Sequence, residues 1–240
     1  MIDVKVGCVA VVLSMGLTAP IAAGPFEDGV AAYNRGDYAT ALRLLRPLAE
    51  QGQAAAQFNL GVMYEKGLSV PPDDAEAVKW YRKAAEQGDT FAQVNLGVMY
   101  AKGQGVAQDY AEAMMWYRRA AEQGDAAAQF DLGLMYTNGQ GVPQDDAEAV
   151  KWFGRAAQQG HVAAQFNLGV MYANGQGVSQ DYVQAYMWFN LAVARFPVSE
   201  TGERETVVGN LDQLAAKMTP AQIAEAQRLA REWQPTTRTP

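Results

Sequence analysis

Apolar and polar positions follow one pattern that occurs four times along the chain. The phrase Ala56–Tyr64, AQFNLGVMY, returns with small changes every 36 residues, and a tryptophan further along keeps the same step. A repeat of this length is typical of a solenoid, in which each unit buries its apolar face against its neighbours. The sequence therefore predicts an all-α fold, an α-solenoid built from four 36-residue repeats. The predicted repeats are 53–88, 89–124, 125–160 and 161–196, with the markers Leu60, Leu96, Leu132 and Leu168 and the markers Trp80, Trp116, Trp152 and Trp188.

Each repeat is predicted to hold two helices with different apolar patterns. The first, helix A, covers Ala54–Lys66 in the first repeat and is apolar on two opposite sides, so we expect it to lie between other helices. The second, helix B, places Trp80 and Tyr81 on one side and Lys79 on the other, which predicts one buried face. Gly61 lies in the middle of helix A, where glycine costs roughly 1 kcal/mol against alanine, and we expect it to let another backbone approach closely.

Recurrent glycine and aspartate residues mark the predicted helix ends. Gly67 is placed to end helix A in the left-handed conformation, and Asp73 is placed to cap the start of helix B. Glu76 has the spacing from Asp73 that a capping box needs, in which each side chain bonds a backbone N–H of the helix start. Because the same spacing of Asp and Glu or Gln returns in every repeat, we interpret these side chains as caps and not as a catalytic pair.

The segments that flank the repeats are predicted to cover the ends of the solenoid. Residues 24–52 have the pattern of a degenerate N-terminal capping repeat that lacks the tryptophan. Residues 197–233 are predicted to form a C-terminal helical cap of two helices. The second of these begins at Thr219, with Pro220 in its first position and a capping-box glutamine three residues after the threonine. Residues 234–240 contain no core-forming residue and are predicted to be a disordered tail.

The first 23 residues have the features of a secretory signal peptide. Lys5 precedes an apolar run from Val6 to Thr18, and small residues stand at Ala22 and Ala23, which predicts cleavage after Ala23. The alternative is a retained anchor, although the apolar run is shorter than the roughly 20 residues that span a bilayer. The sequence therefore predicts a periplasmic or secreted protein.

Composition narrows the classes of function. The formal net charge is −7 without any basic cluster, which argues against nucleic-acid binding. Cys8, the only cysteine, lies in the predicted signal peptide, so the mature chain is expected to have no disulfide and no cysteine-based metal site. His161, the only histidine, offers neither a catalytic triad nor a metal set and is expected at the solvent edge of a helix start. We therefore expect no catalytic residues, no metal and no cofactor.

Together these motifs resemble the Sel-one-like repeat (SLR) family, a relative of the tetratricopeptide repeat. The resemblance rests on the phrase AQFNLGVMY, the Gly-x-Gly-Val loop, the Trp-Tyr pair and the Ala-Ala-x-Gln-Gly ending, and it covers residues 53–196. It implies a right-handed superhelix of antiparallel helix pairs with a concave surface lined by the A helices. It also implies an adaptor that binds proteins or peptides, and exported bacterial members of the family are linked to envelope regulation, polysaccharide control or host contact.

A polar edge remains on the A helices and is the candidate binding site. Side-chain amides both donate and accept hydrogen bonds, so a row of them can bind an extended peptide backbone in the groove. The alternative is that these residues are solvated or bond within the solenoid, and Asp131 breaks the row and suggests recognition of a positive group. The candidate residues are Asn59, Lys66, Asn95, Lys102, Asp131, Asn138, Asn167 and Asn174.

One tryptophan and one tyrosine recur in each repeat at the spacing of core positions. A row of exposed aromatic rings could also bind a sugar. The recurrent residues are Trp80, Trp116, Trp152 and Trp188, and Tyr64, Tyr100, Tyr136 and Tyr172. Phe91, Met114, Met115 and Met187 differ between repeats, and an exposed apolar patch there would mark a partner site, but burial is the expected outcome. The leading hypothesis is a non-catalytic scaffold or adaptor of the bacterial envelope that binds a protein or peptide. One alternative is an exported polysaccharide- or peptidoglycan-binding module. Another is a weak β-lactam-binding or hydrolysing enzyme, as described for cysteine-rich members of the family, but the mature chain lacks their cysteine pairs.

Overall fold

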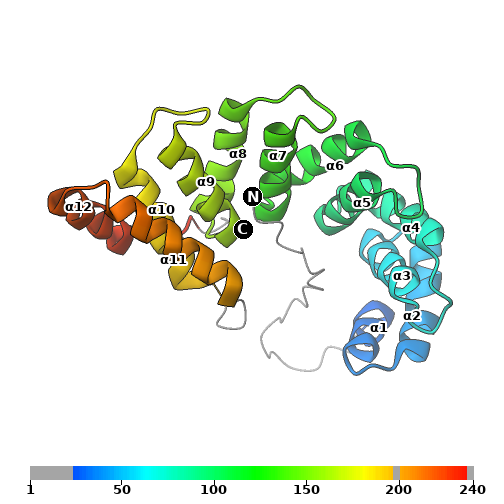
Figure 1. The fold of residues 1–240 in the computed structure, drawn as a ribbon. Helices are drawn as coiled ribbons and strands as arrows, with labels where there is room; N and C mark the ends of the chain where they lie inside the picture. Colours follow the sequence, from blue (N-terminus) through cyan, green and yellow to red (C-terminus); the bar gives the residue numbers. More distant parts are fainter. Residues whose placement is uncertain (1–23, 197–200, 237–240) are drawn as a thin grey trace. The chain divides into compact units, whose positions relative to one another are not determined.

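Twelve α-helices and no strand make up the part of the chain that the computed structural model describes, residues 24–196 and 201–236 (Figure 1). The prediction of an all-α fold with two helices in each 36-residue repeat is confirmed, and helix A of the first repeat has the predicted bounds. The helices are α1 (Pro25–Asn34), α2 (Tyr38–Glu50), α3 (Ala54–Lys66), α4 (Asp74–Glu86), α5 (Thr90–Lys102), α6 (Tyr110–Glu122), α7 (Ala126–Asn138), α8 (Asp146–Gln158), α9 (Val162–Asn174), α10 (Tyr182–Arg195), α11 (Thr201–Ala215) and α12 (Pro220–Glu232).

Neighbouring helices pack as pairs along the chain. Helices α1 and α2 pack together, as do α3 and α4, α7 and α8, and α9 and α10. The second helix of a pair also contacts the first helix of the next, as α2 does with α3, α4 with α5 and α8 with α9. Helices α3 and α9, the A helices of the first and last repeats, are therefore covered on two sides, which explains why they are apolar on both. The helices group into two units, which divide within α6 between Ala120 and Ala121.

The connection from helix A to helix B is the same in all four repeats. The glycine after helix A takes the left-handed conformation, with φ of 66° at Gly67, and the backbone N–H of Asp73 donates to the carbonyl oxygen of Tyr64 at 3.0 Å. Asp73 then caps α4, because its Oδ1 accepts from the N–H of Glu76 at 3.0 Å. The predicted capping box is only half formed, since Glu76 pairs with Lys79 at 2.5 Å. Glu148 and Lys151 repeat this pairing in α8.

The glycine inside each helix A accommodates an aromatic ring, not a backbone as the sequence suggested. A Cβ at Gly133 would lie 2.5 Å from two ring carbons of Phe153, the buried aromatic residue of helix B in the same repeat. At Gly61, Tyr81 is the residue that such a Cβ would meet, at 2.6 Å. The expectation of a close backbone approach at these glycines was therefore wrong. The remaining two pairs are Gly97 with Tyr117 and Gly169 with Phe189.

A buried glutamine in each helix A connects consecutive repeats. Gln129 donates from Nε2 to the carbonyl oxygen of Ala121 at 3.1 Å and accepts from Nε2 of Gln159 at 2.8 Å. Because a buried amide without partners costs about 1–3 kcal/mol, these bonds favour one register between neighbouring helices. In the last repeat Gln165 has no partner for its Oε1, since Arg195 takes the place of the second glutamine. The equivalent bonds to the preceding repeat are Gln57 to Ala49, Gln93 to Ala85 and Gln165 to Ala157.

The second glycine of the loop between helices A and B packs on the preceding repeat. Gly105 has φ of 68°, and a Cβ there would lie 2.3 Å from the carbonyl carbon and oxygen of Asp74, at the start of α4. Gly177 stands in the same way against Asp146. In the first repeat Ser69 occupies this position and is exposed, with a left-handed φ of 58°. Gly105 and Gly177 are thus required by contact as well as by backbone conformation.

The C-terminal segment covers the last repeat with two helices, α11 and α12. Both pack against α10. The predicted capping box of Thr219 and Gln222 at the start of α12 is confirmed. Residues 234–236 lie in the segment predicted to be a disordered tail, yet the N–H of Thr236 donates to the carbonyl oxygen of Gln158 at 2.8 Å. Trp233 lies against Trp188, with ring centroids 6.4 Å apart. This end of the chain is therefore anchored on α8 and α10 up to the last described residue.

Candidate functional site

The structure separates the eight predicted edge residues into two sets. The residue in the middle of each helix A is at least partly buried, whereas the residue that ends the helix is exposed. In α3 the middle residue, Asn59, donates from Nδ2 to the carbonyl oxygen of Ala55 at 2.7 Å, one turn earlier in its own helix. The middle set is Asn59, Asn95, Asp131 and Asn167, and the exposed set is Lys66, Lys102, Asn138 and Asn174.

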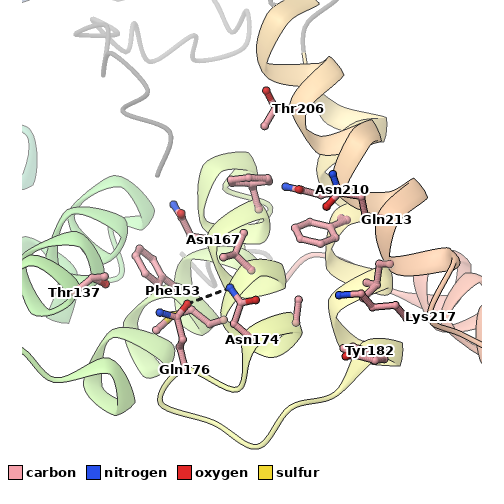
Figure 2. A pocket seen from close by; sticks show the side chains of 16 residues that line it. Thr137, Phe153, Asn167, Asn174, Gln176, Tyr182, Thr206, Asn210, Gln213 and Lys217 are labelled. Atoms are coloured by element: carbon pink, nitrogen blue, oxygen red, sulfur yellow. Dashed lines mark hydrogen bonds between the residues drawn. The ribbon is translucent and has the colours of Figure 1, made fainter.

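Two of these residues, Asn167 and Asn174, line a cavity of about 480 Å³ within the C-terminal unit (Figure 2). The cavity has the size that is usual for ligand sites, which is about 300–1,000 Å³. Figure 2 shows Asn167 between Thr137 and Phe153 on one side and the residues of α11 on the other. Helices α7, α8, α9, α10 and α11 all contribute to the lining, so the C-terminal cap completes the site that the last two repeats begin.

The lining is rich in side-chain amides and contains no acidic residue. Lys217, just beyond α11, is its one charged side chain and stands 6.0 Å from the centroid of the Tyr182 ring. Asn174 and Gln176 bond each other at 3.4 Å, as the dashed line in Figure 2 marks. The aromatic part of the lining is Phe153, Phe166, Phe189 and Tyr182, and the amide part is Asn167, Asn174, Gln176, Asn210 and Gln213.

Asn167 is the unusual residue of this site. Its side chain is only 7% exposed, and its Nδ2 is buried without a hydrogen-bond partner among the described residues. The equivalent Asn59 satisfies its amide within its own helix. Because an unpaired buried donor costs about 1–3 kcal/mol, an acceptor supplied by a ligand would recover this loss. Asn167 is therefore the donor around which a ligand can be placed.

Reasoning from the sequence missed the contribution of α11. Thr206, Asn210, Gln213 and Lys217 are spaced by four, three and four residues, which places them along one face of a helix. The adjacent face of α11 carries Val207, Leu211 and Leu214, which are buried. A polar face of this kind is ordinarily solvated, so only its position against α9 and α10 identifies it as part of a site. The signal available in the sequence was the regular spacing of one hydroxyl side chain, two amide side chains and a lysine.

The aromatic residues of the repeats belong mostly to the core, as predicted. Trp116, Trp152 and Trp188 are buried, and Trp80 is partly buried. Basic side chains cover several of these rings, among them Arg155 over Trp152 at 4.5 Å from the ring centroid. These tryptophans therefore do not form an open ladder for a sugar.

Phe91 and Met115 are the exceptions among the variable apolar residues. They are 39% and 36% exposed, whereas Met114 and Met187 are buried. Phe91 lies beside Phe58 with ring centroids 5.9 Å apart and the rings tilted to each other. The expectation of burial is thus wrong for Phe91 and Met115, which present a small apolar surface, and correct for the other two methionines.

His161 stands at the start of helix A of the fourth repeat, as predicted, and is partly buried there. Its Nδ1 accepts from the N–H of Ala164 at 3.3 Å, so the imidazole caps α9, and its ring stacks on Phe130 with centroids 4.7 Å apart. Burial lowers the pKa of His161 to about 4. The residue is therefore a neutral N-cap, a role that Asp89 and Asp125 fill in the two preceding repeats.

This cap predicts a specific pH dependence of stability. A histidine in the unfolded chain has a pKa of about 6.5. Between about pH 6.5 and 4, His161 is therefore protonated in the unfolded chain but not in the folded chain. His161 should therefore reduce stability as the pH falls through this window, with a slope of up to about 1.4 kcal/mol per pH unit. Urea unfolding followed by circular dichroism measures the pH dependence of stability for the parent and for His161→Asn. The asparagine keeps a capping acceptor but does not titrate. Parallel pH profiles for the two proteins would contradict the prediction.

Two wider features bear on the class of function. Among residues 24–196 and 201–236, no group of three or more His, Cys, Asp or Glu side chains is placed to hold a metal ion. Over the same part of the chain, each helix is too short or too polar to cross a bilayer.

Comparisons with known proteins place the chain in a family. The Sel1 repeat model matches residues 26–53, 54–89, 90–125, 126–161 and 162–195, and the first match falls on the segment predicted as a degenerate cap. The structure of a Sel1 repeat protein from Oxalobacter formigenes is 33% identical, with a TM-score of 0.71 over 88% of each chain.

A second similar structure is that of c5321, described as a protective antigen present in uropathogenic Escherichia coli strains displaying an SLR fold. It is 31% identical, with a TM-score of 0.55 over 88% of this chain and 52% of that chain, so the present chain spans about half its length. No curated protein matches the sequence. The five matched repeats and the two similar structures agree with the helix pairs described above, and the chain belongs to the Sel1 repeat family.

Proposed function

We propose that the protein is a non-catalytic interaction scaffold that binds a polypeptide segment of a partner protein in the cavity formed by α7–α11. The observation that carries this proposal is the buried, unpartnered Nδ2 of Asn167 in a cavity lined by further amides. Amide side chains complement the N–H and C=O groups of an extended backbone, because each amide both donates and accepts. The partly exposed Val170, Ala173 and Tyr182 beside them offer a surface for an apolar side chain of the same segment.

The composition of the cavity favours binding over catalysis. The hydroxyl groups in its lining belong to Thr137, Thr206 and Tyr182, and neither a histidine nor a carboxylate stands in the lining to activate them. The β-lactam alternative needs cysteine pairs, and the only cysteine of the sequence is Cys8. A glycan site would favour exposed aromatic rings along the A helices, whereas the recurrent tyrosines of these helices, Tyr64, Tyr100, Tyr136 and Tyr172, are buried or partly buried.

The export of the protein and its place in the bacterial envelope are part of the proposal. They are supported by the apolar run and the small residues before Gly24. The mass of the protein purified from the periplasm or medium tests this point, since cleavage after Ala23 leaves Gly24 as the first residue. Recovery of the full-length chain from the cytoplasm would contradict it.

Site-specific photo-crosslinking tests the binding function. A benzophenone amino acid replaces Gln213, an exposed residue of the cavity lining, and in a matched control it replaces Lys151, an exposed residue of the same unit outside the lining. We expect a discrete protein adduct from position 213 only, lost when Asn174→Ala and Asn210→Ala are added. The crosslinked residues of the partner should map to one short segment.

Other outcomes would count against the proposal. The same adducts from positions 213 and 151 would show contacts that do not depend on the cavity. Retention of the chain on peptidoglycan or polysaccharide, with no protein adduct at position 213, would instead support the glycan alternative. The thermal unfolding midpoint of the double variant must match that of the parent, so that lost crosslinking reports binding and not folding.

A further inference from the structure

The charge of the cavity differs from the charge of the chain. The protein has a formal net charge of −7, yet no Asp or Glu lines the cavity, and its single charged group is the ammonium group of Lys217. Lys217 forms no ion pair with the acidic residues that the structure describes, and its neighbour in the lining is the ring of Tyr182. The lining therefore carries one positive and no negative side chain on an acidic protein, and an anionic group is the complementary ligand.

The second requirement on a ligand comes from Asn167. Its buried Nδ2 needs an acceptor, and the carbonyl oxygen that satisfies the equivalent Asn59 belongs to the preceding turn of the same helix. In α9 this bond is not made, so the donor remains available. An oxygen acceptor reaching Asn167 from the cavity would remove the cost of the unpaired donor.

The third requirement is apolar. Val170, Ala173 and Tyr182 line the cavity and are partly exposed, whereas Phe166 and Phe189 in the same lining are almost fully buried. A ligand made only of charged or hydroxyl groups would leave this surface without a partner. An apolar side chain beside a backbone carbonyl meets the apolar and the acceptor requirements within one residue.

We propose that the cavity selects a peptide segment that carries a carboxylate, which pairs with Lys217, while a backbone carbonyl of the segment accepts from Asn167 and an adjacent apolar side chain contacts Val170 and Tyr182. This inference rests on the proposed peptide-binding function and adds the class of sequence that is bound. The carboxylate has two possible sources, the C-terminus of a chain or an Asp or Glu side chain. Both present the same group to Lys217.

Selection from a phage-displayed library of random short peptides, followed by fluorescence polarisation with the synthesised sequences, tests the inference. We expect peptides that carry a carboxylate and an apolar residue, and a loss of affinity of about tenfold or more in Lys217→Met and in Asn167→Leu. Lys151→Met is the matched control, since it removes an exposed lysine of the same unit outside the cavity and should leave affinity unchanged. Affinity for the parent should also fall as salt concentration rises.

Modified peptides separate the two sources of the carboxylate. If amidation of the C-terminus abolishes binding, the cavity holds a chain end, and if replacing Asp or Glu by Asn or Gln abolishes it, the cavity holds a side chain. Lys217→Met is the decisive variant, because Lys217 is exposed and its loss should leave the unfolding midpoint unchanged, while Asn167 is buried.

Three results would overturn the inference. Selection of peptides without an acidic group would show that the charge of Lys217 has no role in binding. Equal affinity of the selected peptides for the parent and for Lys217→Met would show the same. Binding of an acidic polysaccharide such as alginate in place of any selected peptide would assign the charge to a glycan. A protein adduct at position 213 together with carboxylate-independent peptides would leave the scaffold function standing and reject only the proposed specificity.

Discussion

Gly105→Ala is expected to lower the free energy of unfolding by about 2–5 kcal/mol. Gly105 has φ of 68°, a conformation that costs a residue with a Cβ roughly 1–2 kcal/mol. The new Cβ would also stand 2.3 Å from the carbonyl carbon and oxygen of Asp74 and 2.7 Å from the nitrogen of Ala75, and overpacking of this kind costs about 1–3 kcal/mol. Both neighbours are backbone atoms of a helix start, so they cannot rotate away.

Urea unfolding followed by circular dichroism measures this effect, and Ser69→Gly is its matched control. Ser69 holds the same place in the first loop with φ of 58° and is exposed, so its replacement should change stability by less than about 1 kcal/mol. Equal, small effects of the two substitutions would show that the loop does not rest on the preceding repeat.

Gly133→Ala is expected to destabilise the protein by about 2 kcal/mol although alanine is the better helix former. The added Cβ would lie 2.5 Å from two carbons of the Phe153 ring, which is only 2% exposed and is held by its neighbours. The overlap costs up to about 3 kcal/mol, and the helix propensity of alanine returns about 1 kcal/mol. The sign of the effect therefore reports the ring contact directly.

A glycine in the partner helix provides the control. Gly154 follows Phe153 in α8, and a Cβ added there would meet no atom within 4 Å, so Gly154→Ala should stabilise the protein by up to about 1 kcal/mol. Phe153→Leu should cost less in the Gly133→Ala background than in the parent, with a coupling energy of about 1 kcal/mol or more. Two alanine variants of equal sign, or a coupling near zero, would reject the contact as the reason for Gly133.

Most of the local structure follows from residues that are close in sequence. The bounds of the A helices were predictable because Gly67 and its equivalents end them and Asp73 and its equivalents begin the next helix, and both effects act within about one turn. The capping box at Thr219 was predictable for the same reason. In the first repeat the capping box is not completed, because Glu76 pairs with Lys79 and not with the backbone. Spacing alone does not show which of these two partners Glu76 takes.

The candidate site was predictable only in part. The sequence singled out Asn59 and Asn167 as equivalent members of one row, since they occupy the same place in identical phrases. Their environments differ, because Asn59 bonds its own helix whereas Asn167 lies buried without a partner in a cavity completed by α11. Equivalence in a repeat therefore predicted position along the helix but not the hydrogen bonds of the side chain.

The sequence by itself determined the period, the helical class, the caps and the apolar faces of this protein, because each depends on spacing along the chain. Tertiary structure alone decided which ring fills the space beside Gly133, that His161 packs on Phe130, and that Asn210 and Lys217 share a cavity with Asn167. The physical reason is that burial and unpaired donors depend on neighbours from other helices. These neighbours are distant in sequence, and only packing brings them together.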